Sequence, residues 1–292
     1  MTYLEEEVKK FNDFLNIPYP YDLPIPDRDL GSDPEKILVL SDPHEPYAHE
    51  PILEYAADAE RDASICVIPG DLGDYYSKSR FKKNRAVSFR DELRAVFFRL
   101  EWLSSRWHTV LVMIGNHDNR PEKKLGDLIG DNVELQLLTE TNLLKRIASY
   151  FPNVQIVGQQ LGGSNFQLTH IFQMGDLIFT HGEISRVQKT ATLEYISKYL
   201  HAWAPVIGLK PYRVIAQAHN HTDLKTSVGE EKWFMLPTCS DPYSIGMEYI
   251  YHSRMVGRPP SLGYSVFYQK DGVTDYNKSH NTVFEYGSTR KP

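Results

Sequence analysis

Carboxylate and imidazole side chains recur at five places along this 292-residue chain, each time within a short motif. A divalent cation that activates water prefers carboxylate oxygen and neutral imidazole nitrogen as ligands. Two such cations held about 4 Å apart need one anionic ligand that both can share. These residue types therefore predict a hydrolytic site built around a pair of metal ions. The motifs are Asp42-Pro43-His44, Gly70-Asp71, Gly115-Asn116-His117-Asp118, His181-Gly182 and His219-Asn220-His221.

Each motif follows a short apolar run, mostly rich in β-branched residues, which is typical of a buried strand. In open α/β sheets, ligands bind beyond the carboxyl ends of the strands, so we expect the five motifs to meet at one edge. Chance placement of polar residues explains one motif easily, but not an ordered series of five. The runs cover residues 37–40, 65–68, 110–114, 177–179 and 214–216.

The first half of the chain alternates strand and helix patterns, which predicts parallel strands joined by crossover helices. Strands are expected at 36–41, 64–69 and 108–114, with helices at 49–62, 86–106 and 133–151. The second half differs, because hairpin signals are more frequent there. It predicts successive strands from Val154 to Thr180 with a turn at Gly162-Gly163, a helix over 185–202, and hairpins around Gly229 and Asp271-Gly272.

In combination, the motifs Asp-x-His, Gly-Asp-x-x-Asp, Gly-Asn-His-Asp, His-Gly and His-x-His resemble those of the calcineurin-like metallophosphoesterase superfamily. The resemblance spans residues 38–221, most of the chain. It implies an α/β fold in which two facing mixed β-sheets are flanked by helices, a four-layer α/β/β/α sandwich. One departure is Ala218, where the family usually has glycine before the final His-x-His; the methyl group removes no ligand.

The resemblance also implies a ligand set for each of two divalent ions. One ion would be held by Asp42, His44, Asp71 and His221, and the other by Asp71, Asn116, His181 and His219. Asp71 is also the natural shared ligand from the residues alone, because it stands by itself after a strand and precedes Gly73. Manganese is favoured, with iron or zinc as alternatives, because the ligands combine nitrogen and oxygen without thiolate.

By the same resemblance, His117 would protonate the leaving oxygen of the substrate, and Asp74 would orient and charge His117. The residues themselves also allow these roles. Asn116 and His117 are consecutive, and consecutive side chains of an extended segment point in different directions. Asn116 can therefore bind metal while His117 faces substrate. A carboxylate partner can keep a histidine protonated near neutral pH. The nucleophile would be a hydroxide that bridges the two metals.

Composition is that of a globular protein, with 41% hydrophobic and 24% charged residues and a net charge of −6. The acidic balance argues against a general nucleic-acid coat protein. No apolar stretch is long enough to span a bilayer, and the acidic N-terminus does not read as a secretory signal. Cys66 and Cys239 are isolated and are interpreted as free thiols. We therefore expect a cytoplasmic protein with no membrane partner.

The N-terminus reads as a short amphipathic helix over residues 3–15, followed by a proline-rich tether over 17–26. The segment either packs on the surface of the domain, which we favour, or makes an oligomer contact. The expected organisation is an N-terminal arm over residues 1–30 and a single metallophosphoesterase domain over 31–292. The oligomeric state cannot be deduced from the sequence.

Basic residues follow two of the motifs, so positive charge is expected to gather around the site despite the acidic total. Such charge would favour an anionic substrate with phosphates on both sides of the scissile bond. The alternative is a solvated loop and helix start. The candidate substrate residues are Arg80, Lys82, Lys83 and Arg120. The stretch from Pro237 to Tyr243 is interpreted as a loop that shapes the substrate site.

These features favour a metal-dependent phosphoric ester hydrolase that acts on a phosphodiester, in the manner of compact bacterial or phage phosphodiesterases and nucleases. The substrate would be a phosphate ester such as a nucleic acid or a nucleotide. Tyr75 stands where serine/threonine phosphatases carry arginine, and Asp42 where lariat-debranching enzymes carry cysteine, so both groups are disfavoured. The alternatives are a phosphomonoesterase that uses the same site and a non-catalytic scaffold with the same fold.

Overall fold

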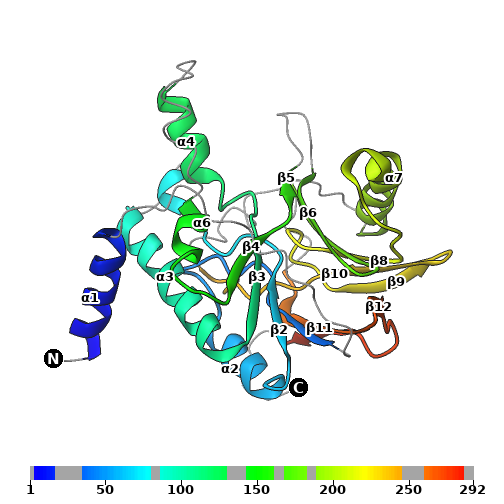
Figure 1. Ribbon diagram of the computed structural model, residues 1–292, viewed down its shortest axis with the longest axis horizontal. Coiled ribbons are helices and arrows are strands. Elements are labelled where there is room, and N and C mark those ends of the chain that lie inside the picture. The colour runs from blue at the N-terminus through cyan, green and yellow to red at the C-terminus, as the bar shows by residue number, and fades with distance from the viewer. Residues whose placement is uncertain are drawn as a thin grey trace.

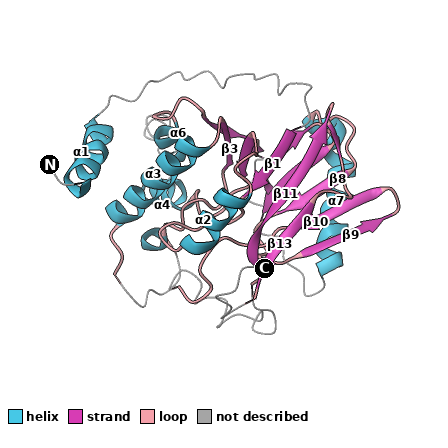
Figure 2. Ribbon diagram, turned by 90° about the horizontal axis from the view of Figure 1, so that it is seen from below, coloured by secondary structure: helices cyan, strands magenta, loops and turns pink. Residues whose placement is uncertain are grey.

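The computed structural model describes residues 3–16, 35–79, 86–129, 143–160, 168–182, 189–244 and 260–285. Over these residues the chain forms two β-sheets that lie face to face, with helices on the outer side of each (Figure 1). Figure 2 shows helices α2, α3, α4 and α6 gathered on one side of the strands. The two facing sheets flanked by helices confirm the predicted fold class.

The first sheet contains four parallel strands in chain order: β1 (Glu35–Val39), β2 (Ile65–Ile68), β3 (Thr109–Met113) and β4 (Val154–Val157). Helices α2 (Glu50–Ala59) and α3 (Phe89–Arg106) connect the first three, as the alternating pattern predicted. The other edge of the sheet is antiparallel. Strand β11 (Leu262–Lys270) pairs with β1, and β12 (Val273–Thr274) and β13 (His280–Phe284) pair with β11.

The second sheet has the strand order β5-β6-β7-β8-β10-β9. Strands β7, β8 and β10 are parallel, whereas β6 and β9 pair antiparallel with β7 and β10. Helix α7 (Lys189–Ile207) precedes β8. The strands are β5 (Gln159–Gln160), β6 (Leu168–Met174), β7 (Leu177–Gly182), β8 (Val214–Gln217), β9 (Leu224–Val228) and β10 (Glu231–Met235).

Alternate residues of each strand face opposite layers, as the period of two in a strand requires. Ile37 and Val39 join an apolar cluster between the sheets that also contains Phe179 and Phe234. Leu38 faces the other way and packs in the cluster formed with α2, α3 and α6 (Leu143–Ala148). Fully burying a side chain of this size contributes about 1.5–3 kcal/mol to stability, so both faces of the sheet hold the layers together.

A third cluster covers the outer face of the second sheet. Ile178 and Ile215 pack there with Leu193, Ile196 and Leu200 of α7. The layers therefore follow the order helix, sheet, sheet, helix.

Helix α1 (Tyr3–Asn16) lies beside α3 (Figure 1). Phe11 is buried against Phe97, with ring centroids 5.8 Å apart, and Lys10 forms an ion pair with Glu101 at 2.7 Å. These contacts agree with an N-terminal helix packed on the domain. The proline-rich stretch over 17–26 lies outside the described residues.

The successive strands predicted from Val154 to Thr180 are divided between the two sheets. Strand β4 does not continue into the second sheet but pairs parallel with β3 in the first sheet. Alternation of apolar residues shows that one face of a strand is buried, but it does not show which strand lies next to it. Both predicted hairpins are present, at Gly229 between β9 and β10 and at Asp271-Gly272 between β11 and β12. The predicted turn at Gly162-Gly163 lies outside the described residues, as does the first part of the helix predicted over 133–151.

Candidate metal centre

The predicted ligand residues come from both sheets and converge at the carboxyl ends of the strands. Asp42 and His44 follow β1, Asp71 follows β2 and Asn116 follows β3, all in the first sheet. His181 lies at the end of β7, and His219 and His221 follow β8, in the second sheet. Except for the half-buried Asn116 and His219, these residues are buried.

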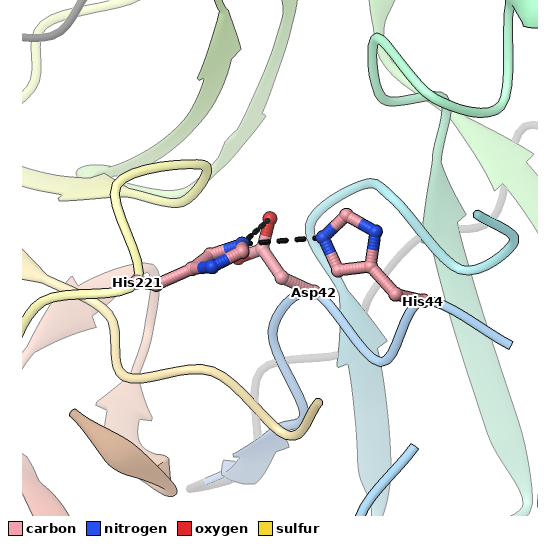
Figure 3. A group of neighbouring side chains, drawn as sticks. All are labelled: Asp42, His44 and His221. Atoms are coloured by element: carbon pink, nitrogen blue, oxygen red, sulfur yellow. Dashed lines mark hydrogen bonds and ion pairs between the residues drawn. The ribbon is translucent and has the colours of Figure 1, made fainter. Parts of the chain in front are cut away.

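Asp42, His44 and His221 form one group, in which a ligand atom from each lies within 4.8 Å of the others (Figure 3). His221 Nε2 lies 3.6 Å from Asp42 Oδ1 and 3.2 Å from His44 Nε2. His44 Nδ1 lies 3.1 Å from Asp74 Oδ1, which leaves Nε2 directed at the group. A carboxylate on the far nitrogen is the usual partner of a metal-binding imidazole, because it fixes the ring and its tautomer.

Asp71, His181 and His219 form a second group. His181 Nε2 lies 3.2 Å from Asp71 Oδ2 and 3.0 Å from Asn116 Oδ1, so the predicted fourth ligand lies beside this group. His181 Nδ1 lies 2.8 Å from the carbonyl oxygen of Pro69, which again leaves Nε2 for the site.

Asp71 lies between the two groups. Its Oδ2 atom is 3.2 Å from His181 Nε2 on one side and 3.8 Å from His44 Nε2 on the other. Its Oδ1 atom accepts a hydrogen bond of 2.7 Å from the backbone N–H of His117. A carboxylate in this position can serve both groups. His44, Asp71 and His117 also form a third grouping that could hold an ion, which the sequence did not predict.

The donor atoms fit divalent cations. His219 Nδ1 is buried and has no hydrogen-bond partner, an arrangement that is costly unless a further group binds it. The set combines carboxylate, imidazole and amide donors without thiolate, which suits manganese, iron or zinc. Burial alone would raise the pKa of Asp71, but the surrounding imidazoles outweigh it and hold the pKa well below its usual range. The carboxylate is therefore ionised.

The two histidines of the second group, His181 and His219, have pKa values shifted in opposite directions. Burial lowers the pKa of His181, but the neighbouring Asp71 carboxylate outweighs this effect and raises the pKa to about 9. Burial and the nearby His181 lower the pKa of His219 to about 3. His219 is therefore neutral at pH 7, whereas His181 would have to release a proton to bind a cation.

The loops that carry these residues have strained backbones. Asp42, His44, Asp71, His219 and His221 all adopt left-handed φ angles between 48° and 76°. Residues with a side chain enter this region at a cost of roughly 1–3 kcal/mol, and such strain gathers at functional sites.

Glycine is required beside this strained backbone because the loops pack closely. A Cβ atom on Gly70 would lie 2.3 Å from Nδ1 of His181, and one on Gly115 would lie 2.1 Å from Oδ1 of Asp71. Real Cβ atoms essentially never approach other atoms so closely, so a side chain at either position would displace a candidate ligand. Lack of space for a Cβ atom therefore explains why both motif positions are glycine.

His117 and Asp74 are paired, as the sequence predicted. His117 Nδ1 lies 2.7 Å from Asp74 Oδ1, and Arg120 lies 2.9 Å from His117 Nε2 through its NH2 atom. Burial, followed by the Arg120 guanidinium, lowers the pKa of His117 to about 4. The lowered pKa differs from the expectation that Asp74 would keep the imidazole protonated near neutral pH. Burial and the guanidinium charge lower the pKa by more than the Asp74 carboxylate raises it.

Asp118 holds two of the motif loops together, a role that the sequence did not reveal. Its carboxylate accepts hydrogen bonds from the backbone N–H groups of Gly115 at 2.8 Å, Gly73 at 2.9 Å and Leu72 at 3.3 Å. Burial, followed by the charge of Asp71, raises the pKa of Asp118 to about 7. Asp118 thus ties the loop after β2 to the loop after β3.

The loop from Pro237 to Tyr243 packs behind the first group. Thr238 donates a hydrogen bond of 2.9 Å to the carbonyl oxygen of Asp42, and the N–H of Cys239 donates to Ser41. Ser41 in turn hydrogen-bonds the carboxylate of Asp42. These contacts support Asp42 from behind, and the predicted substrate-shaping role of the loop stays a prediction.

His170 on β6 is a further residue near the site. It pairs in register with His181 on β7, so both side chains lie on the same face of the sheet. The ring is 2% exposed, and neither nitrogen has a hydrogen-bond partner. Burial, followed by the charge of His181, lowers the pKa of His170 to about 3. No sequence motif marks this position.

Of the candidate substrate residues, Arg120 lies in the site, at the start of α4 (Arg120–Ile129). Arg80, Lys82 and Lys83 lie outside the described residues. Lys78, in the short 3-10 helix η1 (Tyr76–Lys78), has its ammonium 4.3 Å from the ring centroid of Phe89. Among the candidate substrate residues that the structure describes, Arg120 is the one at the site.

The sequence profile of calcineurin-like phosphoesterases matches residues 35–255, which include every candidate ligand. The chain belongs to this family, and it is accordingly a metal-dependent phosphoester hydrolase. No curated protein matches the sequence. Among the described residues, no helix is both long and apolar enough to cross a membrane.

Comparison with solved structures finds matches at low sequence identity. An archaeal phosphodiesterase is 13% identical with a TM-score of 0.37, and the match covers 85% of this chain and 99% of that one. A hypothetical protein from Pyrococcus horikoshii OT3 is 13% identical with a TM-score of 0.45, over 86% and 87% of the two chains. Vacuolar protein sorting 29 from Cryptosporidium parvum is 12% identical with a TM-score of 0.39, over 86% and 98%.

Proposed function

We propose that the protein hydrolyses a phosphodiester with the help of two divalent cations, manganese in the first instance. Asp42, His44, Asp71 and His221 would hold one ion, and Asp71, Asn116, His181 and His219 the other. The observation that supports a two-ion site is the position of Asp71, whose Oδ2 atom lies within 4 Å of an imidazole from each group. Two ions bound there would activate water and polarise the phosphoryl oxygens.

The chain itself would supply a proton to the leaving oxygen. His117 Nδ1 is paired with Asp74, so Nε2 is the nitrogen that can face a bound ester. Its burial and fixed orientation would place the proton donor before the substrate arrives. Asp74 also contacts His44, so one carboxylate would orient both a metal ligand and the acid.

A diester is favoured over a monoester because Arg120 adds a cation on the His117 side of the site. A substrate that carries negative charge on both sides of the scissile bond, such as a nucleic acid or a nucleotide, would use this charge.

We also propose that the enzyme is cytoplasmic. The two buried free thiols, Cys66 and Cys239, support a reducing compartment.

The test compares bis(p-nitrophenyl) phosphate with p-nitrophenyl phosphate after removal of metal and addition of manganese. We expect the diester to be cleaved faster, and no turnover while a chelator is present. The opposite ranking would make the protein a phosphomonoesterase. Absence of turnover on either ester with manganese, iron or zinc would favour the scaffold alternative. Single-stranded, double-stranded and cyclic nucleotide substrates would then identify the natural class.

A further inference from the structure

The side chain of Arg120 spans both members of the His117–Asp74 pair. Its NH1 atom donates to the backbone carbonyl of Asp74 at 2.7 Å and to the Oδ2 atom of the same residue at 3.3 Å. Its NH2 atom lies 2.9 Å from Nε2 of His117. Since Asp74 takes Nδ1 of His117, Nε2 is the acceptor of the Arg120 hydrogen bond.

This geometry places the guanidinium where the leaving group of a substrate would lie. The oxygen that takes a proton from His117 must approach Nε2, and Arg120 already lies against that atom. An imidazole nitrogen cannot accept a hydrogen bond from a guanidinium and donate a proton to an ester oxygen at the same time. The Arg120 contact must therefore be released before His117 can act.

Arg120 also keeps donors for a further anion. A guanidinium has five N–H groups, and among the described residues its Nε atom makes no hydrogen bond. The side chain is 17% exposed, so an anion in the site can reach it. Planar, bidentate donors of this kind suit a phosphate or carboxylate.

We propose, on the basis of the proposed function, that Arg120 selects phosphoesters whose leaving group carries its own anionic group, such as the next phosphate of a polynucleotide strand. The anion draws the guanidinium away from Nε2 of His117. That nitrogen then takes up a proton from solvent and passes it to the leaving oxygen as the P–O bond breaks. A substrate with an uncharged leaving group does not draw the guanidinium away and is a poorer substrate.

The test uses two chromogenic diesters that differ by one carboxylate, methyl 4-nitrophenyl phosphate and methyl 3-carboxy-4-nitrophenyl phosphate, with the manganese-loaded protein. Wild type should show the higher kcat/KM on the carboxylate ester. Arg120→Gln removes the charge and should lower kcat/KM for that ester by about tenfold or more, because charge-assisted hydrogen bonds are worth about that factor or more. For the uncharged ester kcat/KM should not fall and should rise, because the contact that occupies Nε2 of His117 in wild type is gone.

Two further variants complete the comparison. Arg120→Lys keeps the charge but loses the planar fork, so it should retain part of the preference for the carboxylate ester. Arg61→Gln makes the same chemical change at an exposed position just after α2, at the opposite end of the strands from the site, and should leave both rates unchanged. Melting temperature and metal content confirm that each variant is folded and loaded.

Equal losses on both esters in Arg120→Gln and in Arg120→Lys would overturn the selectivity proposal and leave Arg120 as a residue that positions Asp74 and His117. In that outcome the proposed function still stands, because wild type cleaves a diester. If wild type cleaves no phosphodiester at all, the proposed function fails and the role of Arg120 fails with it.

Discussion

Nδ1 of His117 lies 2.7 Å from Oδ1 of Asp74, and both side chains are buried at the ends of parallel strands of one sheet. The same carboxylate oxygen lies 3.1 Å from Nδ1 of His44, in the first group of candidate ligands. A single aspartate thus orients one imidazole toward the metal centre and a second imidazole toward the place where an ester would bind. The proposed metal binding and the proposed proton transfer would therefore be linked through Asp74.

His117→Ala should retain both metal ions but lower kcat by about 10²–10⁴-fold, because it removes the proposed general acid. The loss should be larger for esters with poorer leaving groups, since these need the proton most. Elemental analysis of the variant and kcat on a series of aryl diesters check this prediction. An unchanged rate would exclude His117 from the mechanism, whereas loss of an ion would make His117 a ligand, as its grouping with His44 and Asp71 allows.

Asp71→Asn should weaken both metal sites together, by at least about tenfold each, because it removes the one charge placed between them. His221→Ala is the matched control, since this residue belongs to the first group only and should weaken one site. Titration of the metal-free protein with manganese measures both affinities. Weakening of one site alone in Asp71→Asn would contradict its assignment as the shared ligand.

His170→Leu should reduce the loss of stability in mild acid. The pKa of His170 is about 3 in the folded protein and about 6.5 when unfolded, so the unfolded state binds more protons between these values. Its contribution is therefore complete above pH 6.5 and is lost as pH falls toward 3, by about 2 kcal/mol at pH 5.

Urea unfolding of wild type and His170→Leu at pH 7.5 and pH 5 measures this difference. At pH 7.5 the variant should be at least as stable as wild type, because neither ring nitrogen is hydrogen-bonded. An identical pH dependence in the two proteins would show that His170 does not titrate in this window.

Phe11→Ala should destabilise the protein by about 3 kcal/mol, because the ring is 2% exposed and packs on Phe97 of α3. Val8→Ala changes an exposed position of the same helix and should cost about 0.5 kcal/mol or less. Urea unfolding measures both values. Equal, small effects would mean that α1 is not part of the folded domain in solution.

The candidate ligands could be predicted from the sequence because each directly follows a strand whose apolar pattern is strong. The carboxyl ends of parallel strands in one sheet share an edge, so the motifs after β1, β2 and β3 were expected to meet there, whereas the motifs of β7 and β8 reach them from the facing sheet. The contact between Arg120 and Nε2 of His117 could not be predicted, because it depends on how the side chain turns at the first residue of α4. The pairing of β4 with β3 could not be predicted either, because the apolar pattern of β4 fits a strand of either sheet.

The roles of Asp118 and His170 were missed for a related reason. Asp118 belongs to a motif, but its carboxylate faces backbone N–H groups of a loop more than 40 residues earlier in the chain. His170 lies on a strand with no motif and becomes notable only through its register with His181. Both roles depend on contacts between segments far apart in the sequence.

The left-handed backbone at Asp42, His44, Asp71, His219 and His221 has a consequence for directed evolution of this enzyme. Glycine adopts these φ angles without penalty, so replacing any of the five would relax the loop while discarding a donor atom. A library screened for heat resistance alone would therefore accumulate glycines at these positions and yield proteins that are stable but catalytically inactive. Screens for robust variants should score turnover in every round.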